Sequence, residues 1–108
     1  ILLKKIKKKN YKIAAYGAAA KTTTFMNYFK IDKNLIEFIF DDNKLKQNKF
    51  APFTHIPILN PKEIYKKKVH FVIILAWNYS DHIIKKHRLF LKKKGKFIIP
   101  FPKIKVIR

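Results

Sequence analysis

The sequence predicts an α/β fold, a Rossmann-like, doubly wound and mostly parallel sheet of about five or six strands with helices on both faces. Short apolar runs alternate along the chain with segments of helical spacing, a pattern typical of parallel strands joined by right-handed crossovers. The run Phe71–Trp77 is apolar throughout, as expected of a strand covered on both faces, and is too short to cross a membrane. With 108 residues, 48% of them hydrophobic, the chain is expected to form one domain, residues 1–108.

The first third of the chain predicts a helix, a strand and a second helix. Leu2–Lys9 has helical spacing and stops at Asn10, a residue that tolerates the left-handed conformation. Lys12–Tyr16 is a predicted strand that ends at Gly17. The alanine-rich segment Ala18–Phe29 is the predicted helix that follows this turn.

The middle of the chain predicts two further strands and a short helix. Leu35–Phe40 is rich in Ile and Phe and runs into a turn at Asp41-Asp42-Asn43, after which we expect a loop to Thr54. His55–Leu59 is a short predicted strand, and Asn60 is placed to cap a brief helix that ends at Lys68.

The last third begins with His70–Ala76, the most apolar segment and the predicted centre of the sheet. Trp77-Asn78-Tyr79 closes this strand, and Ser80 or Asn78 is expected to cap a helix with Ile83, Ile84 and Leu91 on one stripe and a stop at Gly95. Two more strands are predicted, Phe97–Ile99 and Ile104–Ile107.

Composition and charge narrow the classes of function. The formal net charge is +20, yet among 26 basic residues only Arg88 and Arg108 are arginines, and specific reading of bases relies heavily on arginine. We therefore expect no specific nucleic-acid partner and no membrane partner, although a basic nucleic-acid binder stays open as a lesser alternative. Cysteine is absent, which excludes disulfides and thiolate sites. His82 and His87 are five residues apart on a predicted helix, so we expect surface histidines and no metal site.

Polar residues follow three of the predicted strands. Because ligands of open parallel sheets bind beyond the carboxyl ends of the strands, we expect these clusters to outline one crevice. The candidate substrate-binding residues are Tyr16, Gly17, Ala18, Lys21 and Thr22 after the first strand, Asp41, Asp42 and Asn43 after the second, and Trp77, Asn78 and Tyr79 after the central strand.

The first cluster has the spacing of a dinucleotide fingerprint, with Ala15, Gly17 and Ala20 at the glycine positions. Asp41 or Asp42 lies at about the distance of the acid that holds a ribose, about 20 residues on. Such an alanine-rich turn also serves simple packing, so both interpretations remain open. The adjacent aspartates are expected to bond loop amides and not to act as an acid–base pair, and no catalytic residue is assigned.

Several segments occur together in an order that marks a known family: Ala14–Lys21, Asp41–Asn43, Leu45–Gln47, His55–Ile58, Leu75–Tyr79 and Gly95–Pro100. In these the chain resembles the C-terminal domain of S-adenosylmethionine-dependent sugar C-methyltransferases, which act on nucleotide-linked deoxy-ketosugars. The resemblance spans nearly the whole chain.

The resemblance implies a cytoplasmic enzyme in which a zinc-binding module and a central methyltransferase domain precede this domain. The central domain would supply the S-adenosylmethionine site and the catalytic residues, so this chain would be a fragment that binds no cofactor, is inactive alone and has two partners, the nucleotide-sugar and the central domain. The alternative is a free-standing Rossmann-like nucleotide-binding module.

Overall fold

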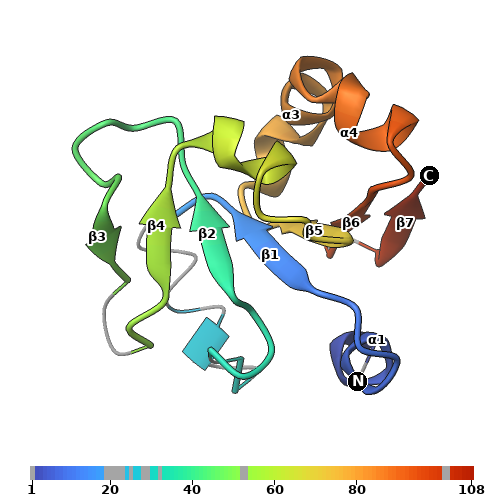
Figure 1. The fold of residues 1–108 in the computed structure, drawn as a ribbon, viewed down its shortest axis with the longest axis horizontal. Helices are drawn as coiled ribbons and strands as arrows, with labels where there is room; N and C mark the ends of the chain where they lie inside the picture. The colour runs from blue at the N-terminus through green and yellow to red at the C-terminus, as the bar shows by residue number, and fades with distance from the viewer. Residues whose placement is uncertain are drawn as a thin grey trace.

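The computed structural model describes residues 2–18, 24, 26–27, 30–31, 33–51, 54–100 and 103–108. In these ranges seven strands form a single sheet, with α-helices and 3₁₀ helices between them (Figure 1). The elements in chain order are α1 (Leu2–Lys8), β1 (Ile13–Tyr16), β2 (Phe38–Phe40), β3 (Lys49–Phe50), β4 (Pro57–Leu59), η1 (Pro61–Tyr65), β5 (Phe71–Ile74), η2 (Trp77–Tyr79), α3 (Ser80–Lys86), α4 (Arg88–Lys92), β6 (Lys96–Ile99) and β7 (Lys105–Ile107).

The order of the strands across the sheet is β3-β4-β2-β1-β5-β6-β7. The five inner strands are parallel, and β3 and β7 run antiparallel at the two edges. The chain moves outward from β1 to β2 and β4, then returns to place β5 on the other side of β1. This reversal makes β1 and β5 the switch point of a doubly wound sheet, which confirms the predicted fold class.

The sheet has one strand more than predicted, because β3 lies within the segment expected to be a loop. Lys49 and Phe50 are both exposed and are joined only to β4, at Ile58 and Pro57. A strand of two exposed residues has no apolar alternation, so no local pattern could have revealed it.

Both faces of the sheet are covered, with α1 on one side and α3 and α4 on the other (Figure 1). All four residues of β1 are buried. Ile13 and Ala15 belong to the cluster that includes α1, whereas Ala14 and Tyr16 belong to the cluster that includes α3 and α4. Because successive side chains of a strand point to opposite faces, β1 contributes to two separate apolar layers.

The predicted helix ends are confirmed at one position and altered at another. Asn10 is left-handed after α1, with a φ of 64°. After α4 the left-handed residue is Lys94, with a φ of 70°, and not Gly95. The Gly95 N–H donates to the Phe90 carbonyl at 2.9 Å and the Lys94 N–H to the Leu91 carbonyl at 3.0 Å, the paired bonds of a Schellman motif.

Gly95 is needed for packing instead, since a Cβ there would lie 2.4 Å from ring carbons of Phe90.

Other predicted boundaries hold in part. Asn60 caps η1 as predicted, accepting the Lys62 N–H at 2.9 Å, but η1 is a 3₁₀ helix that ends at Tyr65, short of Lys68. The predicted cap of the next helix is wrong, because Tyr79 occupies the cap position of α3 and makes no side-chain cap bond among the described residues. The predicted helix 18–29 falls mostly outside the described residues. Residues 24, 26 and 27 of that segment are described, and they are helical.

Candidate functional site

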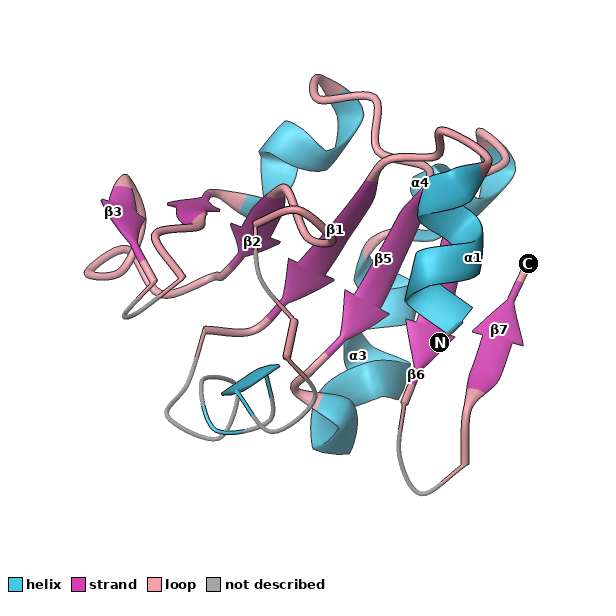
Figure 2. Cartoon of the chain, turned by 90° about the horizontal axis from the view of Figure 1, so that it is seen from below, coloured by secondary structure: helices cyan, strands magenta, loops and turns pink. Residues whose placement is uncertain are grey.

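The carboxyl ends of β1, β2 and β5 meet at one edge of the sheet, which we call the rim and define as residues 16–18, 41–43 and 75–79. The Gly17 N–H donates to the Phe40 carbonyl at 2.8 Å, and the Leu75 N–H donates to the Tyr16 carbonyl at 3.0 Å. Figure 2 shows β1, β5 and β6 pointing the same way. The strand ends after which the candidate residues lie are therefore contiguous.

At Gly17 the chain leaving β1 comes into close contact with the chain leaving β5. Its φ is 106°, and a Cβ there would lie 2.9 Å from the Cβ of Ala76. Both the backbone conformation and the contact with the end of β5 require glycine.

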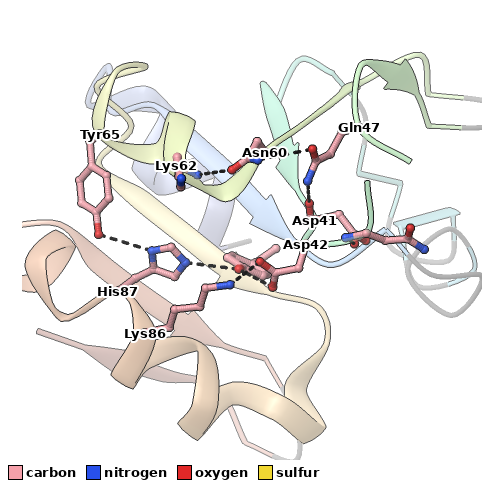
Figure 3. Close-up of polar contacts among 10 residues, drawn as sticks. Asp41, Asp42, Gln47, Asn60, Lys62, Tyr65, Lys86 and His87 are labelled. Atoms are coloured by element: carbon pink, nitrogen blue, oxygen red, sulfur yellow. Dashed lines mark hydrogen bonds and ion pairs between the residues drawn. The ribbon is translucent and has the colours of Figure 1, made fainter. Parts of the chain in front are cut away.

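Asp41 uses its carboxylate to hold the turn together. Oδ2 accepts the Ala18 N–H at 2.8 Å and Oδ1 accepts the Asn43 N–H at 2.8 Å, as expected for an aspartate that bonds loop amides. The Gln47 side chain donates to the Asp41 carbonyl at 2.8 Å (Figure 3). The Ala18 amide is thus bound to a carboxylate, and a unit negative charge about 4 Å from that carboxylate would meet a repulsion of about 4 kcal/mol near a protein surface.

Asp42 points to different partners from Asp41, so the two aspartates do not form a carboxylate pair. Asp42 accepts the Tyr16 hydroxyl at 2.9 Å and forms an ion pair with Lys86 at 2.5 Å. Burial raises the pKa of Asp42, but the hydrogen bonds from Lys86 and Tyr16 and the charge of Lys86 outweigh burial and hold that pKa below its ordinary value.

His87 is buried, with 4% of its surface exposed, which corrects the prediction of a surface histidine. It occupies the junction where the predicted single helix is broken into α3 and α4. Nε2 lies 3.3 Å from the Tyr16 hydroxyl and Nδ1 lies 3.4 Å from the Tyr65 hydroxyl (Figure 3). The spacing of Ile83, His87 and Phe90, all buried, is the signal that could have placed this histidine on the inner face.

The hydrogen bonds, together with the lowered pKa that keeps His87 neutral, indicate where the protons of this cluster lie. Tyr16 has one proton, which it donates to Asp42, so His87 donates from Nε2 and accepts the Tyr65 proton at Nδ1. Burial, together with the charge of Lys86, lowers the pKa of His87. Burial, together with the hydrogen bond to Asp42, raises the pKa of Tyr16. The cluster therefore holds neutral rings around one carboxylate and ties the turn after β2 to the α3–α4 junction.

A groove of about 310 Å³ lies on the rim side, between η2 and the β6–β7 hairpin. Its described lining consists of Trp77, Asn78, Ser80, Asp81, Ile99, Lys103 and Lys105. Two of the predicted site residues, Trp77 and Asn78, line this groove, whereas neither Gly17 nor Asp42 does. Tyr79 is 68% exposed beside them.

Sequence reasoning missed the two lysines of the groove. Lys105 pairs with Ile99 in the antiparallel register of β6 and β7, which brings it to the carboxyl end of β6. The signal was available in the two predicted strands separated by a short proline-containing segment, a spacing that favours an antiparallel return. Lys21 and Thr22 lie outside the described residues, so their place in the site remains a prediction.

The described ranges hold no group of three or more His, Asp or Glu side chains arranged to bind a metal ion. Within the same ranges no helix combines the length and apolar character needed to cross a bilayer.

Comparison with known proteins bears on both the family and the fold. The family described as C-methyltransferase C-terminal domain matches residues 1–102. C-methyltransferase NovU of Streptomyces niveus is 35% identical over 95 residues, which are 88% of this chain and 23% of that protein, so the chain spans about a quarter of the length of this relative.

Among solved structures, UDP-D-quinovosamine 4-dehydrogenase of Vibrio fischeri superposes with a TM-score of 0.62 at 20% identity, over 91% of this chain and 93% of that one. At this identity the likeness is one of fold alone, and it supports the Rossmann-like architecture.

Proposed function

The chain belongs to the family of C-methyltransferase C-terminal domains, and on this premise we propose that it binds the substrate of an enzyme that methylates a carbon of a nucleotide-linked deoxy-ketosugar. The observation that carries the proposal is the arrangement of the rim: three strand ends at the switch point of the sheet, beside a groove that presents Trp77, Asn78 and two lysines. Ligands of open α/β sheets bind at this place.

In this proposal the domain binds and orients the substrate and the chemistry takes place on another part of the enzyme. A carbon beside a keto group becomes nucleophilic when a base removes its proton, and S-adenosylmethionine supplies the methyl group. At the described start of the turn after β1, the Ala18 amide is bound to Asp41 and the space beside Gly17 is closed by Ala76, which supports a cofactor site elsewhere. We therefore assign the cofactor and the base to a central domain of a longer polypeptide.

The coding sequence upstream of Ile1 tests that assignment. A continuous reading frame with a glycine-rich methyltransferase motif is expected. A start codon at this boundary would favour the rival, a free-standing nucleotide-binding module.

Titration of the complete enzyme tests the substrate class. We expect a deoxythymidine diphosphate ketosugar to bind in preference to NAD or ATP. Asn78→Ala should weaken binding of the nucleotide-sugar and leave the affinity for S-adenosylmethionine unchanged, because Asn78 is exposed at the groove. Asn27→Ala, an exposed asparagine of a different cavity, is the matched control and should change neither affinity. Tight binding of NAD or ATP without preference for the sugar nucleotide would contradict the proposal.

A further inference from the structure

We propose that the diphosphate of the nucleotide-sugar binds in the groove between η2 and the β6–β7 hairpin, against Lys103 and Lys105, and not at the glycine turn after β1. The identity of the ligand rests on the proposed function. The position of the phosphates rests on the charges and contacts described below.

Lys103 and Lys105 are exposed, and among the described residues neither forms an ion pair. Two described lysines nearer the turns after β1 and β2 have partners, since Lys86 is paired with Asp42 and the ammonium group of Lys46 donates to the Ala18 carbonyl at 3.0 Å. Lys103 and Lys105 are therefore available to an anion on the β6–β7 side of the rim.

The fold places these lysines at the carboxyl edge of the sheet, on the β6 side of the switch point. Ile99 is the last residue of β6, and its antiparallel partner Lys105 is the first residue of β7. Ile99 packs with the cluster of α3 and α4, and so does Ile107, which shares the face of Lys105 because side chains alternate along a strand. Lys105 therefore stands beside the start of α3, at the carboxyl end of the parallel strands.

The glycine turn is the poorer place for a phosphate. The Ala18 N–H already donates to Asp41 at 2.8 Å, and the next residue, Asp42, carries a second carboxylate at the same turn. A phosphate that used the Ala18 amide would have to displace Asp41 from it and would lie against the Asp41 carboxylate.

The size and lining of the groove suit one part of a nucleotide-sugar. A volume of about 310 Å³ is at the lower end of small-molecule pockets, so the groove accommodates a diphosphate with an adjoining ring and leaves the rest of the ligand outside. Asp81 also lines the groove, and its carboxylate can accept a hydrogen bond from a hydroxyl of the sugar.

The test compares ligand binding by the complete enzyme and its variants. Lys103→Ala and Lys105→Ala should each weaken binding of deoxythymidine diphosphate and of its sugar about tenfold, and the double variant more, because each removes one charge-assisted contact. Affinity for thymidine, which has no phosphate, should stay the same in every variant. Lys103→Arg and Lys105→Arg should retain most of the binding. Lys92→Ala, an exposed lysine at the end of α4, is the control and should bind as the wild type does.

The outcomes separate the two proposals. If the wild-type enzyme binds neither deoxythymidine diphosphate nor its sugar, the proposed function is wrong and the assignment of the groove falls with it. If the wild type binds and the double alanine variant binds equally tightly, the proposed function stands and the phosphates lie elsewhere. The melting temperature of each variant should match that of the wild type, because both lysines are exposed. This measurement distinguishes a loss of binding from a loss of folding.

Discussion

Removing the Tyr16 hydroxyl should destabilise the hydrogen-bonded cluster around His87, which joins the turn after β2 to the α3–α4 junction. In Tyr16→Phe, Asp42 loses a donor at 2.9 Å and the Nε2–H of His87 loses its acceptor at 3.3 Å. The Asp42 side chain is 49% exposed and retains Lys86, so water replaces most of what it loses. His87 is buried and keeps an unsatisfied donor, and we expect the free energy of unfolding to fall by about 2 kcal/mol.

Urea denaturation of the 108-residue chain measures this loss, followed by the fluorescence of the single tryptophan and by circular dichroism. Tyr79→Phe removes the same hydroxyl from a ring that is 68% exposed and should change the stability by less than about 0.5 kcal/mol. The pKa of Asp42, followed by NMR, should rise in Tyr16→Phe because one of the hydrogen bonds that lowers it is lost. Equal stability of the two phenylalanine variants would refute the role assigned to the cluster.

Three further predictions concern α3 and α4, the helices that cover the Tyr16 face of the sheet. The pKa of His87 lies below its ordinary value of 6.5, so near that pH the folded chain binds fewer protons than the unfolded chain. The free energy of unfolding should therefore fall as the pH drops below about 6.5, by at most about 1.4 kcal/mol per pH unit. Urea titrations between pH 7.5 and 5.5, about one unit either side of that pKa, should show a smaller slope in His87→Gln, and equal slopes would contradict the assignment. Gly95→Ala should cost about 1–3 kcal/mol through the contact with Phe90, and less in a Phe90→Leu background; an additive result would argue against this contact. Lys94→Gly should raise the melting temperature, gaining about 0.5–1 kcal/mol at the left-handed position, whereas a lower melting temperature would show that the residue is not strained there.

The parts of the fold that could be predicted are those encoded by local apolar patterns. The buried strands β1 and β5 each consist of four consecutive buried residues, and the rim follows from them because parallel strands place their carboxyl ends at one edge. The contact of Gly17 with Ala76 then joins two segments that are distant in the sequence.

The parts that were not predicted depend on partners far along the chain. β3 exists only by its pairing with β4, and Lys105 reaches the groove only through its register with Ile99. His87 was assigned to the surface because its polarity was given more weight than its spacing from Ile83, and two tyrosines supply the partners that permit its burial. In each case the deciding contact is tertiary.

Hydrogen exchange of the complete enzyme, with and without a deoxythymidine diphosphate ketosugar, tests the proposed role of this domain most directly. If the rim and its groove receive the substrate, amides of residues 77–81 and 103–105 should exchange more slowly when the ligand is bound, and those of the exposed strand β3 should not change. Slowing confined to segments outside this domain would contradict the account.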